Sequence, residues 1–214
     1  MRVRLLSRAQ GLALLICTIT GFPETLARPG GQGPETRQII EAYEKWKELK
    51  TRKREYAKDR ECNPNQIRIL LQAGRLGEGD LMGFGSASFS FADINQDGVT
   101  DALTTFNPKQ CDGGNASMHS QVALLILSKN ARHSYKVDDQ TLENLHDDQT
   151  LRNLLETTDG WFLRFQEVQG NGIVSGTAYA FHSGDKFKPG DARCCPSIWK
   201  AFTYTYLSKR VTLK

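Results

Sequence analysis

The sequence predicts an α+β fold dominated by β-strands, with an N-terminal helix followed by an antiparallel meander. Residues 35–61 repeat apolar side chains at three- and four-residue spacing, which is typical of an amphipathic helix. Segments such as 86–94 and 198–207 instead alternate apolar and polar residues, as half-buried strands do. A Gln-Gly-Asn-Gly turn at 169–172 separates two further apolar segments and predicts a hairpin. One helix followed by a run of strands indicates an α+β domain.

Composition excludes several classes of protein. The chain has 214 residues, a length that fits one domain or two small ones. Charged residues make up 24% and hydrophobic residues 39%, so the chain can form a core and is not disordered by composition. Lys and Arg number 28 against 24 Asp and Glu, an excess too small to predict a nucleic-acid binder. Because the only long apolar stretch lies at the N-terminus, we expect no transmembrane span in the folded protein.

The first 27 residues have the order of a secretory signal peptide. Arginines at positions 2, 4 and 8 precede a short apolar run over 11–22, and small residues follow at Thr25 and Ala27. We therefore expect export, to the periplasm or beyond it. A buried N-terminal helix and lipid anchoring at Cys17 are the alternatives.

After this segment, the pattern predicts a flexible lead, one helix and one β-rich domain. Residues 28–34 are rich in Gly and Pro and are expected to form the lead. Residues 35–61 form the amphipathic helix, and residues 62–214 form the domain. The polar face of the helix carries a basic run over 50–60. This run is either a solvated helix face or a surface for an anionic membrane or partner.

The expected meander follows from the alternation of apolar residues along the domain. Residues 121–127 are continuously apolar and predict a central strand buried on both faces. Residues 142–155 carry spaced leucines and predict helical turns, while residues 67–71 fit a strand or a short helix. A glycine-rich loop is expected over 74–85. The other expected strands are 86–94, 99–106, 134–137, 161–168, 173–181, 198–207 and 211–213.

The segment from Asp93 to Asp101 has the spacing of a calcium-binding loop. Oxygen-bearing side chains occupy its first, third, fifth and ninth positions, and Gly98 at the sixth allows a sharp turn. Calcium is a hard cation that takes six to eight oxygen ligands. An Asp- and Asn-rich turn without metal is the alternative. The expected ligands are the side chains of Asp93, Asn95, Asp97 and Asp101 and the carbonyl of Val99.

This loop resembles the strand–loop–strand calcium loop of FG-GAP and VCBS repeats over residues 91–103. The twelfth position is Thr104 instead of the glutamate of an EF-hand, and the flanking segments predict strands instead of helices. Without a twelfth ligand, we expect modest affinity, with a Kd of about 10⁻⁴–10⁻³ M. We therefore expect Ca²⁺ to stabilise the structure and not to act as a switch.

The cysteine count agrees with export. Removal of residues 1–27 would take away Cys17 and leave four of the five cysteines, which are Cys62, Cys111, Cys194 and Cys195. A bond between the neighbours Cys194 and Cys195 would be strained. We therefore expect Cys62 and Cys111 each to pair with one of these neighbours, although four cysteines allow three connectivities.

Two cysteine-containing motifs carry a second resemblance. Gln-Cys-Asp-Gly-Gly-Asn occupies 110–115, and Gly-Asp-Ala-Arg-Cys-Cys-Pro-Ser occupies 190–197, before an aromatic strand. With the Asp93 loop, this order resembles LppP/LprE-like envelope proteins. It is also similar to periplasmic inhibitors of secreted lysozyme-type toxins. The resemblance implies an exported bacterial protein without a known catalytic centre.

Together these features predict a non-enzymatic periplasmic or secreted binding protein, stabilised by calcium and disulfides. Its partner would be another protein, specifically a cell-wall-degrading enzyme that it inhibits or confers immunity against. No pair of histidines has the spacing of a zinc site. The loops at 74–85 and 184–197 are the expected contact surfaces. The alternatives are an envelope hydrolase using carboxylates such as Glu156 and Glu167, and a structural envelope component.

Overall fold

The computed structural model describes residues 33–58, 62–76, 81–111, 121–129, 134–155, 161–182, 190 and 195–213. The predicted signal peptide and most of the predicted lead lie outside these residues, as do 77–80, 184–189 and 191–194 of the two predicted contact loops. Cys194 is among them. Within the described part of the chain, no helix is long and apolar enough to cross a membrane.

The first helix, α1, spans Pro34–Arg52 and begins with proline, whose fixed φ suits the first turn. It buries Ile39, Tyr43 and Trp46, which lie three or four residues apart and so share one face. The helix predicted from the sequence over 35–61 extends beyond the observed end of α1 at Arg52. After Arg52 the chain turns, with Arg54 at a φ of 60°, and Ala57 forms a bridge with Gly83.

A second helix, α2, spans Pro64–Gln72, where the sequence left a strand or a short helix open. The Asn63 side chain caps it by accepting a hydrogen bond from the Asn65 N–H at 3.0 Å. Later in the chain, the predicted helical turns form a 3₁₀ helix, η2 (Glu143–Asp147), followed by α3 (Gln149–Leu154).

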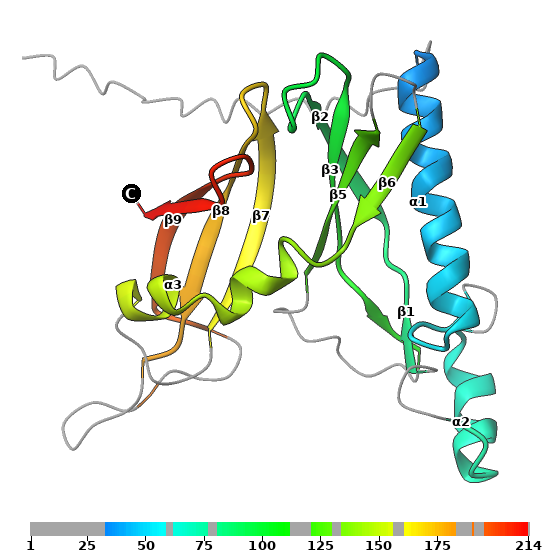
Figure 1. The fold of residues 1–214 in the computed structure, drawn as a ribbon. Helices are drawn as coiled ribbons and strands as arrows, with labels where there is room; N and C mark the ends of the chain where they lie inside the picture. The colour runs from blue at the N-terminus through cyan, green and yellow to red at the C-terminus, as the bar shows by residue number, and fades with distance from the viewer. Residues whose placement is uncertain are drawn as a thin grey trace, which may run out of the picture. The chain divides into compact units, whose positions relative to one another are not determined.

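Two four-stranded antiparallel sheets dominate the fold (Figure 1), which confirms the β-dominant, antiparallel prediction. The first sheet has the order β2-β3-β5-β6, and the second has the order β10-β9-β8-β7. A short ladder pairs β1 (Met82–Gly83) with β4 (Lys109–Gln110). The strands of the first sheet are Ala87–Ala92, Asp101–Phe106, Val122–Lys129 and Ser134–Asp138. Those of the second, from β7 to β10, are Trp161–Gln169, Ile173–Ala180, Ile198–Thr205 and Arg210–Leu213.

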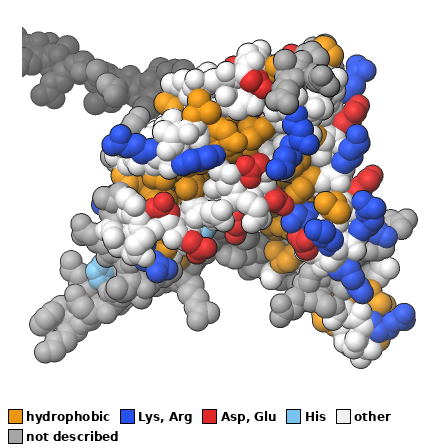
Figure 2. Space-filling view, in the orientation of Figure 1, with side chains coloured by type: hydrophobic (Ala, Val, Ile, Leu, Met, Phe, Trp, Pro, Cys, Tyr) orange, Lys and Arg blue, Asp and Glu red, His pale blue; other side chains and the backbone are white. Residues whose placement is uncertain are grey.

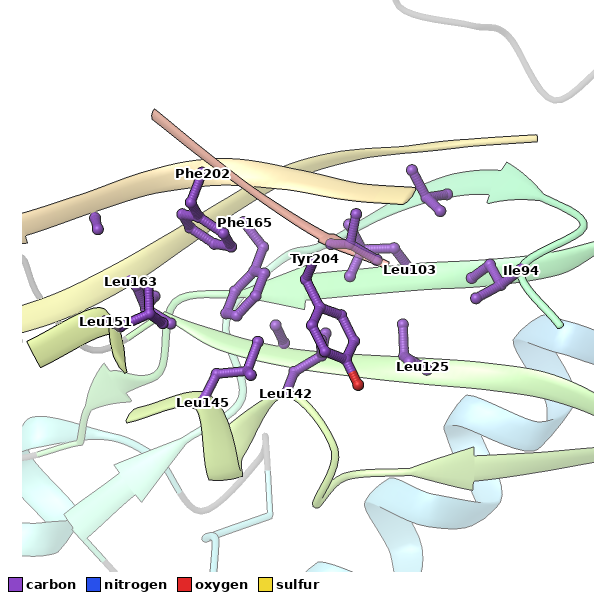
Figure 3. Close-up of a cluster of buried hydrophobic side chains, with 14 of the residues drawn as sticks. Ile94, Leu103, Leu125, Leu142, Leu145, Leu151, Leu163, Phe165, Phe202 and Tyr204 are labelled. Carbon is purple, nitrogen blue, oxygen red and sulfur yellow. The ribbon is translucent and has the colours of Figure 1, made fainter. Parts of the chain in front are cut away.

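The main core lies between the two sheets and beneath η2 and α3. Figure 3 shows side chains from both sheets, such as Leu125 and Leu163, pointing into it together with leucines of the helical segment. Leu125 and Leu163 are both fully buried. The neighbours of Leu125 on β5, Leu124 and Ile126, are equally buried on the opposite face of the sheet. The prediction that this strand is buried on both faces is therefore confirmed.

The opposite face of the first sheet packs against α1 through aromatic rings. Trp46 contacts Phe84 and Phe106, with ring centroids 5.9 and 6.1 Å apart, respectively. A polar tether crosses this contact: the Trp46 indole N–H donates to Asp139 at 3.0 Å, and Lys50 pairs with the same carboxylate oxygen at 3.0 Å. Asp139 follows β6, so the tether joins the helix to the edge of the sheet.

The disulfide pairing predicted from the sequence is wrong, because Cys62 is bonded to Cys111. The β1–β4 ladder brings the two segments together, with the Cys111 N–H donating to the Leu81 carbonyl at 2.7 Å. The two Cα atoms are thereby 4.5 Å apart. The spacing of the cysteines in the sequence does not indicate this ladder, because each of its strands has only two residues. Cys195 is exposed.

The two sheets meet at the edges of β2 and β7 through side chains. The Ser90 hydroxyl accepts from the Val168 N–H at 3.1 Å. Gln121 accepts from the Phe165 N–H at 2.7 Å and donates to the Phe165 carbonyl at 3.2 Å. The two hydrogen bonds of Gln121 lie at a register shift in β7 between Phe165 and Glu167. Side-chain groups thus satisfy backbone groups that a neighbouring strand would otherwise pair.

Candidate functional site

The segment predicted to bind calcium forms the connection between β2 and β3. Its turn is held by its own side chains: Asp93 accepts hydrogen bonds from the N–H groups of Asp97 and Gly98, at 3.1 and 2.9 Å. Gly98 has a φ of +83°, a conformation that glycine adopts without steric cost. The sharp turn that the sequence assigned to this glycine is therefore confirmed.

Asp101 is the buried anchor of the loop. Its side chain is fully buried, and its carboxylate accepts three backbone N–H groups, from Ile94 at 2.9 Å, Asn95 at 3.1 Å and Ser128 at 2.7 Å. The first two donors belong to the loop, and the third belongs to β5. A single carboxylate therefore fixes the loop to the central strand of the first sheet.

Ser128 links the remaining polar side chains of the loop to β5. Its hydroxyl donates to Asp97, and its hydroxyl and carbonyl oxygens both accept from the Asn95 amide, at 3.2 and 3.3 Å. Ser128 was not predicted to contact the loop, because it directly follows a run of apolar residues that is typical of a buried strand. Only the tertiary structure brings it to the loop.

The loop also contacts the second sheet. The Gln96 amide donates to the Asn171 carbonyl at 3.0 Å, in the turn between β7 and β8. The next residue in that turn, Gly172, lies so close to the loop that an added Cβ would be 2.3 Å from the Ile94 carbonyl oxygen. The Ile94 side chain is buried in the core between the sheets. Figure 1 shows the loop and the turn at the same end of the two sheets.

Burial and the hydrogen bonds of the loop carboxylates set the electrostatics of this region. Burial, together with the charges of Glu35, Asp101 and Asp97, raises the pKa of Tyr135 to about 12. Burial also raises the pKa of Asp101, although three N–H donors oppose it. At Asp97 burial acts in the same direction, but hydrogen bonds from Ser128, Val99 and Asn95 outweigh it and lower the pKa. A cation would be attracted to such a site.

The chemistry of the donors fits Ca²⁺, since every candidate ligand is an oxygen. Asp93 uses two of about four lone-pair positions for N–H donors, so its carboxylate can still accept a cation. Asp101 has three such positions occupied and contributes mainly as the anchor. Among the described residues, no three Asp, Glu, His or Cys side chains gather into a metal-binding group. The calcium prediction therefore stays a prediction.

A second feature that sequence analysis missed is an aromatic row on the second sheet. The register of β7, β8 and β9 places Phe162, Tyr179 and Trp199 side by side. The Phe162 and Tyr179 rings are stacked, with centroids 5.0 Å apart, and Trp199 is 68% exposed. The buried residues Phe202 and Tyr204 of β9 face the core, so Trp199 lies on the opposite face. The alternation of β9 could have predicted this exposure.

The other candidate residues do not form a site with the loop in the described part of the chain. Glu167 is exposed on β7, and its carboxylate accepts a hydrogen bond from the Ser175 hydroxyl at 3.5 Å. Glu156 lies outside the described residues.

No known protein family, no curated protein and no solved structure matches this chain.

Proposed function

We propose that this chain is an exported, non-enzymatic binding protein that inhibits a cell-wall-degrading enzyme and is stabilised by structural Ca²⁺. The observation that carries the binding proposal is Trp199, which is 68% exposed at the end of the row of three rings. Exposed tryptophan on a rigid sheet is the residue type that contributes most to protein interfaces. The sequence resemblance to periplasmic inhibitors of lysozyme-type toxins supports the class of partner.

Calcium would act at the junction of the two sheets. Asp93, Asn95, Asp97 and the Val99 carbonyl would hold the ion, with Asp101 fixing the loop to β5. The same loop donates to Asn171 in the β7–β8 turn. An ion bound there would therefore restrain the first sheet relative to the sheet that carries Trp199.

Thermal unfolding in 10 mM calcium and in chelator tests the metal. With a Kd of about 10⁻⁴–10⁻³ M, calcium is expected to raise the Tm by about 3–10 °C. Asp97→Asn, which keeps the shape of the side chain, should remove this increase. Asp147→Asn, at an exposed carboxylate outside the loop, should retain it. Equal melting in calcium and chelator for the unsubstituted protein would exclude the ion.

Capture of cell-wall hydrolases tests the partner. The immobilised protein should retain a lysozyme-type enzyme and inhibit its hydrolysis of peptidoglycan. Trp199→Ala should weaken this binding about 30-fold or more, as loss of a central aromatic anchor does. Leu207→Ala, at a side chain that is 53% exposed in the turn after β9, is the matched control and should bind normally. Absence of inhibition across a panel of such enzymes would contradict the proposal.

A further inference from the structure

Positive charge is concentrated in one part of this chain. Residues 44–58 and 62–76, together with the three residues between them, contain ten Lys or Arg against five Asp or Glu. Over the whole sequence the balance is nearly even, with 28 Lys and Arg against 24 Asp and Glu. These two segments therefore lie in a part of the chain that carries an excess of positive charge.

The structure brings these two segments together. Arg52 and Lys58 line the same groove beside the end of α1, over Phe84, and the other charged residues that line it are Lys47, Glu44 and Glu48. The Lys58 carbonyl accepts from the Cys62 N–H at 3.0 Å, directly before α2 begins. Ile67 of α2 packs in the same buried cluster as Ala57. The second helix thus lies next to the basic end of the first, as Figure 1 shows.

Exposed aliphatic side chains accompany the charges. On α2, Ile69 is 63% exposed and Leu71 is 45% exposed, and on the last turn of α1, Leu49 is 40% exposed. Figure 2 shows apolar and basic side chains mixed at the lower right, where α2 and the end of α1 lie. We call this surface the basic corner. It comprises Arg52, Lys53, Arg54, Lys58, Ile69 and Leu71, all of which are exposed.

We propose that the basic corner binds the surface of an anionic phospholipid bilayer. Lys and Arg side chains are attracted to anionic headgroups, and aliphatic side chains gain free energy by entering the boundary with the acyl chains. Attraction between these cations and a bilayer surface does not require a concave binding site on the protein. The Cys62–Cys111 disulfide holds the start of α2 against β4, so the helix does not need to be ordered on binding.

The composition of the corner favours lipid over a protein partner. Protein interfaces are depleted in Lys, and their strongest contacts come from Trp, Tyr and Arg. The corner has two arginines, but it also has two lysines and exposed Ile and Leu, and no aromatic residue belongs to it. The surface around Trp199 has a different character, because Trp199 continues the row of the Phe162 and Tyr179 rings. The two surfaces are therefore assigned to different partners.

Flotation of the full-length mature protein with lipid vesicles tests this proposal. The assay compares vesicles of neutral phosphatidylcholine with vesicles that contain phosphatidylglycerol, in chelator, so that calcium at the 93–101 loop plays no part. We expect binding to the anionic vesicles alone, weakening as salt is raised. Combined substitution R52Q/K53Q/K58Q should reduce the partition coefficient about 100-fold, at about fivefold per charge. Ile69→Ser should reduce it further when added.

The matched control removes three exposed cations elsewhere, K129Q/R152Q/R210Q, with the same change in net charge. It should bind anionic vesicles within about threefold of the unsubstituted protein. Equal loss in both triple variants would show a net-charge effect and overturn the corner as a site. Retention on immobilised poly-glutamate without vesicle binding would indicate an acidic protein partner and overturn the membrane proposal. Thermal melts of each variant establish that it is folded.

Discussion

The two faces of the first sheet pack against different kinds of side chain. One face meets the second sheet through a core made mostly of leucine, valine and alanine. The other meets α1 through rings, including those of Tyr43, Trp46 and Phe106. Adjacent residues of β5, such as Leu124 and Leu125, therefore belong to different cores although both are fully buried.

The two cores therefore stabilise different contacts within the fold. The aliphatic core joins two sheets, and the hydrogen bond that the Gln96 amide donates to the Asn171 carbonyl adds to that junction. The aromatic core attaches one helix, and the described polar link across it runs from Trp46 and Lys50 to Asp139. Damage to the first core should therefore affect the whole β-structure, whereas damage to the polar link should affect the docking of α1.

The largest effect is expected from the aliphatic core. Leu125→Ala removes a fully buried side chain and should lower the free energy of unfolding by about 2–5 kcal/mol, measured by urea denaturation. Leu207→Ala, at an exposed leucine, should change it by less than about 0.5 kcal/mol. Similar values for the two variants would mean that burial between the sheets does not stabilise the fold.

A smaller effect is expected where the loop approaches the β7–β8 turn. Gly172 has a φ of +71°, and a Cβ there would be 2.3 Å from the Ile94 carbonyl oxygen. Gly172→Ala should therefore cost about 1–3 kcal/mol of unfolding free energy. Gly170→Ala, two residues earlier with open space around it, is the control and should be close to neutral. Equal stability of both variants would disprove the close contact between loop and turn.

The smallest effect is expected at the tether of α1, and it should depend on pH. Burial alone would raise the pKa of Asp139, but hydrogen bonds from Trp46 and Lys50 and the Lys50 charge outweigh it and lower the pKa. The stabilisation is thus fully present above the unfolded pKa of about 3.9 and is lost as pH falls through the lower folded value. Asp139→Asn should cost about 1 kcal/mol at pH 6.

Denaturation of Asp139→Asn and the unsubstituted protein at several pH values measures this dependence. The difference between them should shrink below about pH 4. A difference for Asp139→Asn that stays constant down to pH 2 would rule out the charged tether.

Local periodicity predicted much of the fold. The alternating segments 86–94 and 198–207 correspond to β2 and β9, and the continuous apolar run over 121–127 corresponds to β5. These strands could be predicted because burial of one face or of both faces determines which neighbouring residues are apolar. The turn at 169–172 connects β7 and β8 as expected. The helix predicted over 35–61 was too long, since the polar residues after Arg52 carry no signal for where the chain turns.

Long-range contacts could not be predicted in the same way. The Cys62–Cys111 bond depends on a ladder of two-residue strands, which has no periodicity. For the loop, spacing correctly placed the turn at Gly98, but Asp101 is held by the Ser128 N–H, 27 residues away in sequence. Pairing of this kind is decided by tertiary structure and leaves no local pattern.

The Gln121 side chain has a consequence for the solubility of the folded chain. An unprotected strand edge offers its amide and carbonyl groups to any extended chain, and proteins that expose one are prone to aggregate. At Phe165 the Gln121 amide already occupies both groups, and the Ser90 hydroxyl occupies the Val168 N–H nearby. At these positions the edge of β7 is therefore protected from pairing with another chain by side chains instead of by a further strand.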